Sequence, residues 1–230
     1  MRFTILAAEW NAKLVALAKV MNSKVALPIY STFLLELKDG VLRITASDMD
    51  CSRCSTLPVM DMDRANEHNG SLCVTASFLL DSLKNLGDQP VTFEADEENL
   101  SVVIRYNNGQ FDMVGFPAKD YALPGTMGKS VQVTIEASVL NDSIGKSLYA
   151  VGNDDLRPIF SGIYFTKKGD ELQCATTNGS MLVRNTYKVE NDGQEYSFLL
   201  HSRAAKIVRS MTSKSDEKVQ VFITEREVAF

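Results

Sequence analysis

The sequence of 230 residues contains an internal repeat, and this repeat constrains the fold more than any other feature. The segment Leu27–Ser31 (LPIYS) returns 130 positions later as Arg157–Ser161 (RPIFS). Each copy follows an alternating apolar segment, Met1–Leu6 or Val131–Glu136, and a helical stretch, and each precedes two strands joined by a tight turn. The chain is therefore predicted to contain two units of the same architecture.

Two predicted hairpins extend the repeat. Asp39-Gly40 separates two apolar strands in the first half. This dipeptide favours a tight hairpin turn, because both central residues take positive φ angles there. Gly169 lies in the corresponding turn of the second half. The strands of the two hairpins are predicted at Phe33–Leu37, Val41–Ala46, Gly162–Thr166 and Glu171–Thr176.

Helical periodicity in both halves indicates the fold class. Two helices are expected in each half, with Phe78 on the buried side of the second one. Further strands follow the second helix of each half. We therefore predict an α+β fold, in which tandem repeats each pack two helices on antiparallel sheets. The helices are predicted at Glu9–Met21, Ser77–Leu86, Ser138–Ala150 and Ser202–Met211.

The repeat also predicts the domain boundaries. The first copy continues into another hairpin at Asn107–Gln110, whereas the second copy stops at Phe230, where that hairpin is due. A complete domain is therefore expected at residues 1–123 and an incomplete one at 130–230. Residues 124–129 contain proline and glycine and are expected to form the linker.

The balance of charge argues against nucleic-acid binding by the chain as a whole, since 24 Lys and Arg face 29 Asp and Glu, a net charge of −5. Basic residues nevertheless gather on predicted helix faces, and Arg203, Lys206 and Arg209 share one side of their helix. A solvated face is the alternative explanation. If the helices of both repeats lined one surface, an acidic chain would still present a basic track. The opposite, apolar side of that helix holds Ala204, Ile207, Val208 and Met211.

No group of residues predicts catalysis, a cofactor or a metal site. Cys51 and Cys54 have the spacing of half a zinc or redox site, but no second cysteine or histidine pair completes one, so structural cysteines are the preferred interpretation. His68 and His201 fall in separate halves and outside any catalytic motif. A thiol enzyme that uses the two cysteines remains a weaker hypothesis.

The sequence predicts a cytoplasmic protein without a membrane partner. No apolar run approaches the roughly 18 residues of a membrane helix. The segment Met1–Trp10 is too short to form the apolar core of a signal peptide. Four irregularly spaced cysteines do not suggest a disulfide framework.

Three segments together resemble the sliding clamp family, the β subunit of bacterial DNA polymerase III. They are Leu27–Ile29, Leu34–Asp48 and Leu156–Phe165. The resemblance covers nearly the whole chain, as the first domain and most of the second. It implies the DNA clamp fold, with three domains in a full-length chain and a homodimeric ring whose helices line the hole. It also implies a non-catalytic processivity factor that encircles duplex DNA and tethers the replicative polymerase.

The resemblance further implies a surface that contacts double-stranded DNA without reading its sequence. Such contact needs scattered cations and few base contacts. In the loop Gly152–Arg157, Asp154 and Asp155 would repel phosphate, which makes contact at that loop doubtful. The residues expected at the DNA-facing surface are Lys24, Arg203, Lys206 and Arg209, followed by Lys19 and Lys146.

A pocket for short peptides of the polymerase and the clamp loader is also implied, between the second and third domains. The matching positions are Phe160, Thr177, Gly179 and Leu182, and ordinary core packing is the alternative for Phe160 and Leu182. Where the family usually has Asp-Gly-His-Arg-Leu, this chain reads Asn-Gly-Ser-Met-Leu at residues 178–182. That change, with the acidic loop and the missing third repeat, motivates an alternative function: a partner-binding or regulatory module that does not encircle DNA.

Overall fold

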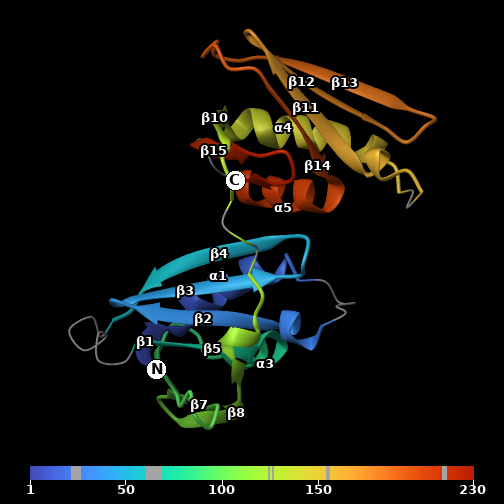
Figure 1. Cartoon of the computed structure of the whole chain (residues 1–230). Helices are drawn as coiled ribbons and strands as arrows, with labels where there is room; N and C mark the ends of the chain where they lie inside the picture. The colour runs from blue at the N-terminus through green and yellow to red at the C-terminus, as the bar shows by residue number, and fades with distance from the viewer. Residues whose placement is uncertain (22–26, 61–68, 124, 126, 154–155, 214–216) are drawn as a thin grey trace. The chain divides into compact units, whose positions relative to one another are not determined.

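The computed structural model describes residues 1–230 apart from 22–26, 61–68, 124, 126, 154–155 and 214–216. Lys24, Asp154 and Asp155 therefore lie outside the described residues. The chain divides into two compact units, Met1–Pro124 (unit 1) and Gly125–Phe230 (unit 2) (Figure 1).

Unit 1 contains two antiparallel sheets, ordered β1-β6-β7-β8 and β4-β3-β2-β5-β9. The helices α1 and α3 lie against each other and cover one side of these sheets (Figure 1). The helices of unit 1 are α1 (Ala7–Ala18) and α3 (Ala76–Leu83), with short 3-10 turns at Pro28–Ser31 (η1) and Ala118–Asp120 (η3). Its strands are β1 (Arg2–Leu6), β2 (Thr32–Lys38), β3 (Val41–Ser47), β4 (Ser52–Pro58), β5 (Gly70–Thr75), β6 (Pro90–Ala95), β7 (Ser101–Tyr106), β8 (Gly109–Val114) and β9 (Phe116–Pro117).

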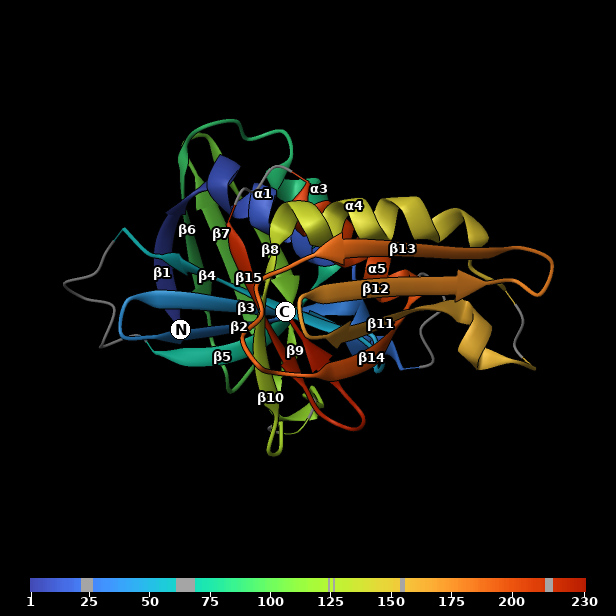
Figure 2. The same cartoon turned by 90° about the horizontal axis from the view of Figure 1, so that it is seen from above.

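Unit 2 repeats this plan with sheets ordered β13-β12-β11-β14 and β10-β15-β16. Its two helices pack on each other, and seen from above they lie along the same side of the four-stranded sheet (Figure 2). The helices of unit 2 are α4 (Ala137–Ser147) and α5 (Ser202–Thr212), with 3-10 turns at Leu148–Ala150 (η4) and Pro158–Ser161 (η5). Its strands are β10 (Val131–Glu136), β11 (Gly162–Lys168), β12 (Glu171–Thr177), β13 (Leu182–Lys188), β14 (Tyr196–His201), β15 (Lys218–Ile223) and β16 (Val228–Ala229). The predicted α+β fold is confirmed.

Aromatic side chains pack in the core of each unit. In unit 1 the Trp10 ring of α1 lies edge-on to Phe3 at 5.4 Å and to Phe93 at 5.8 Å, and all three side chains are buried. In unit 2 Phe165 and Phe198 stack at 4.9 Å between neighbouring strands. Burial of such a side chain contributes about 1.5–3 kcal/mol. Each unit therefore has a core of its own.

The two hairpin turns behave as the repeat predicts. Asp39 and Gly40 both take positive φ, 51° and 76°, and Gly169 takes 57°. The correspondence continues past the hairpins, because the loop after β3 holds Met49 at φ 85° and the loop after β12 holds Gly179 at φ 91°. These two residues are also 130 positions apart.

Several local predictions were wrong. Phe160 lies in the 3-10 turn η5 rather than on a strand, because Pro158 begins that turn. Phe78 is 36% exposed and meets Phe111 edge-on at the surface. In α5 Met211 is exposed rather than buried. Thr212 is buried instead and accepts a hydrogen bond from Asn141 of α4. The buried residues of α5 are Ala205, Val208 and Thr212.

Replacement of Met49 by glycine tests the strain in unit 1. Left-handed backbone costs a non-glycine residue about 1–2 kcal/mol, and Met49 is 64% exposed, so little packing is lost. After the larger unfolded-state entropy of glycine is subtracted, Met49→Gly should raise the free energy of unfolding by about 0.5–1 kcal/mol. Urea titration followed by the fluorescence of Trp10, the single tryptophan, reports on unit 1.

The matched control is Met60→Gly. Met60 is 58% exposed and has no left-handed φ, so the same change should lower the free energy of unfolding. Equal losses at both positions would contradict the strain argument.

Candidate functional site

The polar face of α5 carries the three basic residues that sequence analysis placed on one side of that helix. Lys206 and Arg209 are exposed on α5, and among the described residues no carboxylate lies within ion-pair distance of either. Arg203 is half-buried at the first turn, where its backbone N–H donates to Nδ1 of His201 at 3.3 Å. The structure thus brings the three predicted basic residues onto one helix.

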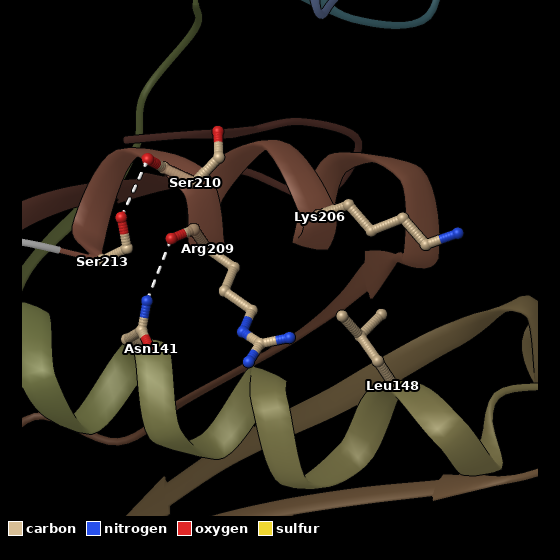
Figure 3. Close-up of a pocket in the computed structure, with 6 residues that line it drawn as sticks. All are labelled: Asn141, Leu148, Lys206, Arg209, Ser210 and Ser213. Atoms are coloured by element: carbon tan, nitrogen blue, oxygen red, sulfur yellow. Dashed lines mark hydrogen bonds between the residues drawn. The ribbon is translucent and has the colours of Figure 1, made fainter.

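A groove of about 320 Å³ runs between the two helices (Figure 3). The amide of Asn141 on α4 donates to the backbone oxygen of Arg209 at 2.9 Å and to Oγ1 of Thr212 at 3.2 Å, and these bonds fix the separation of the helices. None of the described residues that line the groove is acidic. The lining residues are Asn141, Leu148, Lys206, Arg209, Ser210 and Ser213. We call it the α4–α5 groove.

The other predicted basic positions differ in character. Lys146 forms an ion pair with Asp142 at 2.6 Å, and its ammonium lies 5.9 Å from the ring centre of Tyr187. The hydrogen bond from Lys146 holds the pKa of the Asp142 carboxyl below its usual range. Lys19 is exposed and follows the last residue of α1 rather than lying within the helix. The positive charge of Lys146 is therefore largely compensated, whereas that of Lys19 faces solvent.

The predicted peptide-binding positions come together at one end of unit 2. The backbone N–H of Gly152 donates to the oxygen of Phe160 at 2.8 Å, and a β-carbon on Gly152 would lie 3.5 Å from Cα of Asn178. Oδ1 of Asn178 accepts hydrogen bonds from the backbone of Ser180 and Met181, so the turn after β12 is held rigid. The 3-10 turn η5 and this turn are thus neighbours.

Exposure of the apolar side chains at this end rules out ordinary core packing for Leu182, which is 74% exposed. Ile159 is 68% exposed and Phe160 is half-buried, with the Arg157 guanidinium 5.0 Å from its ring centre. The flanking strands add Tyr164 and Leu199, which sequence analysis missed. An apolar surface of this kind is typical of an interaction site.

In unit 1 the corresponding surface is covered by the chain itself. Tyr121 follows η3 and packs edge-on against Tyr30 at 5.6 Å, and the Tyr30 hydroxyl donates to the oxygen of Ala122 at 3.2 Å. Leu34 and Cys73 are buried beneath it, although their counterparts Tyr164 and Leu199 in unit 2 are exposed. Tyr30 and Phe160 occupy the same position of the repeated segment, so the two surfaces correspond.

The cysteines do not form a reactive centre among the described residues. Cys51 and Cys54 form no disulfide; Cys54 is exposed and Cys51 is half-buried, and no group of metal ligands is found in the described part of the chain. Burial raises the pKa of Cys73 and of Cys174 to about 12. No helix within the described residues is long and apolar enough to cross a membrane.

Comparison with protein families gives two adjoining matches. The model described as DNA polymerase III beta subunit, N-terminal domain, matches residues 1–124. The model of the central domain of the same subunit matches residues 134–230.

Curated relatives and solved structures agree with these matches. The beta sliding clamps of Staphylococcus epidermidis and Staphylococcus aureus are 23% and 22% identical over 233 residues, which cover this whole chain and 62% of theirs. The chain thus spans about three fifths of their length. A putative DNA polymerase III beta subunit from Eubacterium rectale has the same fold, with a TM-score of 0.91 and 15% identity over 99% of this chain and 61% of that one. The Bacillus subtilis sliding clamp gives 0.90 and 22% over the same shares.

Replacement of Tyr121 by alanine should uncover Cys73. With a pKa near 12, the Cys73 thiolate is a roughly 10⁻⁴ fraction at pH 8, so the native chain should react with a thiol reagent at Cys54 but not at Cys73 or Cys174. Tyr121→Ala should lower the free energy of unfolding by about 3 kcal/mol and make Cys73 reactive. Mass spectrometry of the labelled peptides measures both.

Cys174 in unit 2 serves as the internal control and should stay protected. Trp10 fluorescence must show that unit 1 remains folded in this variant. A Cys73 thiol that stays protected in folded Tyr121→Ala would contradict the covering role of Tyr121.

Proposed function

Since the chain belongs to the DNA polymerase III beta subunit family, we propose that it acts as part of a sliding clamp that encircles duplex DNA and tethers the replicative polymerase. The observation that carries this proposal is the family match of both units together with their tandem clamp fold. In this role the chain is a non-catalytic processivity factor that works in the cytoplasm.

The charge distribution supports contact with DNA that does not depend on sequence. Lys206 and Arg209 stand at the surface without acidic partners among the described residues, and Arg203 shares their helix. Phosphate contacts of this kind position a protein on the duplex but carry no base information. Weak contacts permit sliding, and retention comes from closure of the ring. We assign smaller contributions to DNA contact to Lys19 and Lys146, and we assign Lys24 to DNA contact on the resemblance alone.

The apolar end of unit 2 supports a docking role. Phe160, Thr177, Gly179 and Leu182 lie at this end, and we propose that they receive short peptides of the polymerase and the clamp loader. The homodimeric ring is proposed for a full-length chain of this family.

A second function is favoured by one feature of the docking turn. Residues 178–182 read Asn-Gly-Ser-Met-Leu and offer neither the imidazole nor the guanidinium that the family usually has. A chain with altered partner choice could serve as a partner-binding or regulatory module that does not encircle DNA.

Retention on DNA of different topology separates the two functions. Loaded by the clamp loader of the same organism onto nicked circular DNA, a clamp should stay bound during gel filtration and should be lost once the circle is cut, because a ring slides off free ends. Equal retention on circular and linear DNA, or none on either, would contradict encirclement.

Substitution at the docking turn tests the peptide site. Leu182 is 74% exposed, so Leu182→Ala should change the free energy of unfolding by less than about 0.5 kcal/mol. The affinity for a peptide from the polymerase should nevertheless fall at least tenfold, since an apolar anchor is lost.

The matched control is Leu156→Ala, which removes a 92% exposed leucine from the loop before η5. Fluorescence anisotropy of a labelled peptide measures both variants. Equal losses would show that exposed apolar area in general, rather than the docking turn, governs binding.

A further inference from the structure

The middle of α4 contains a glycine that the helix itself does not need. Gly145 lies within Ala137–Ser147, where glycine is about 1 kcal/mol less favourable than alanine. A β-carbon at Gly145 would lie 3.2 Å from Nη2 of Arg209 and 3.3 Å from its Cζ and Nε. These distances are shorter than ordinary van der Waals contact, so the missing side chain makes room for the guanidinium of Arg209.

The same distances define the orientation of that guanidinium. Three atoms of its plane are almost equally far from the β-carbon position, so the flat side of the group rests on α4. The N–H donors lie in this plane and therefore point along the groove rather than into the helix. Figure 3 shows the Arg209 side chain reaching down from α5 to α4. Within the described residues, no acceptor is hydrogen-bonded to these donors.

The surroundings of Arg209 favour an anion. Lys206 lies one turn earlier on α5 and lines the same groove (Figure 3). Ser210 and Ser213 also line it, and their hydroxyls donate to backbone oxygens of Ile207 and Ser210. The carboxylate of Asp142 on α4 forms an ion pair with Lys146 at 2.6 Å and accepts a hydrogen bond from the Tyr187 hydroxyl at 2.9 Å. The α4–α5 groove is thus positively charged and open to solvent.

We propose that Gly145 positions the guanidinium of Arg209 so that Arg209 and Lys206 together bind a single backbone phosphate of duplex DNA in the α4–α5 groove. This inference rests on the proposed function, because it takes DNA as the ligand. An arginine fork binds phosphate through two parallel hydrogen bonds, and a fork already held against a helix loses less conformational freedom on binding. Arg209 is then a site-specific phosphate ligand, and Gly145 is a positioning residue.

The salt dependence of DNA binding tests the proposal. Each phosphate neutralised on B-DNA contributes about 0.9 to the slope of log K against log salt. For the full chain and a fluorescently labelled duplex at low salt, Arg209→Ala should reduce this slope by about 0.9 relative to the unchanged protein. Lys168→Ala removes an exposed cation from the β11–β12 hairpin of the same unit and should leave the slope unchanged.

Gly145→Ala tests the positioning role of Gly145 while the positive charge of Arg209 is kept. Alanine should leave the thermal midpoint the same or higher because it is the better helix former, yet it should weaken duplex binding a few-fold by displacing the guanidinium. The Nε–H NMR signal of Arg209 should shift on addition of duplex in the unchanged protein and shift less in this variant.

The possible outcomes distinguish this inference from the proposed function. If Arg209→Ala binds duplex with an unchanged salt slope, or if Lys168→Ala reduces the slope as much as Arg209→Ala does, the phosphate-binding role of Arg209 is overturned. Encirclement of DNA is not affected by either result. Unchanged affinity in Gly145→Ala would overturn the positioning role. Absence of duplex binding by the unchanged chain at low salt would overturn the proposed phosphate site. Loss of topological retention on circles, with the slope change present, would overturn encirclement alone.

Discussion

The packing of two helices on antiparallel sheets is the constraint on which the rest of each unit depends. In unit 1 the ring of Trp10 on α1 packs between Phe3 and Phe93, and in unit 2 Ala205 and Val208 form the buried side of α5. Once these apolar sides are buried, the polar sides must face outward. The position of Lys206 and Arg209 at the surface is therefore a consequence of how the core is packed.

The repeat relates an apolar surface of unit 1 to an apolar surface of unit 2. Tyr121 and Ala122 cover the apolar surface around Tyr30 in unit 1, whereas Ile159, Phe160 and Leu182 are accessible in the described chain of unit 2. Tyr30 and Phe160 thus hold the same position of the repeat, in a covered surface of unit 1 and in an accessible one among the described residues of unit 2.

Local turn chemistry and periodicity were sufficient to predict most elements of the fold. Asp39-Gly40 predicted its hairpin because positive φ is a property of those two residues themselves. The buried side of α5 was predicted correctly at Val208 but wrongly at Met211, and burial of Thr212 was missed because its partner Asn141 on α4 lies far away in sequence. The contact between Gly145 and Arg209 could not be predicted from the sequence either, because the two residues lie on different helices. The docking and DNA-facing residues came from family resemblance, and their assignments stay predictions.

We propose that enclosure retains the chain on DNA and that its positive charge contributes only weakly to retention. The lifetime of the loaded protein on closed circular DNA, measured at 50 and at 200 mM salt, tests this claim most directly. Enclosure predicts lifetimes that differ by no more than a few-fold. A fall of about a thousandfold, as expected for a protein held by several phosphate contacts, would contradict it.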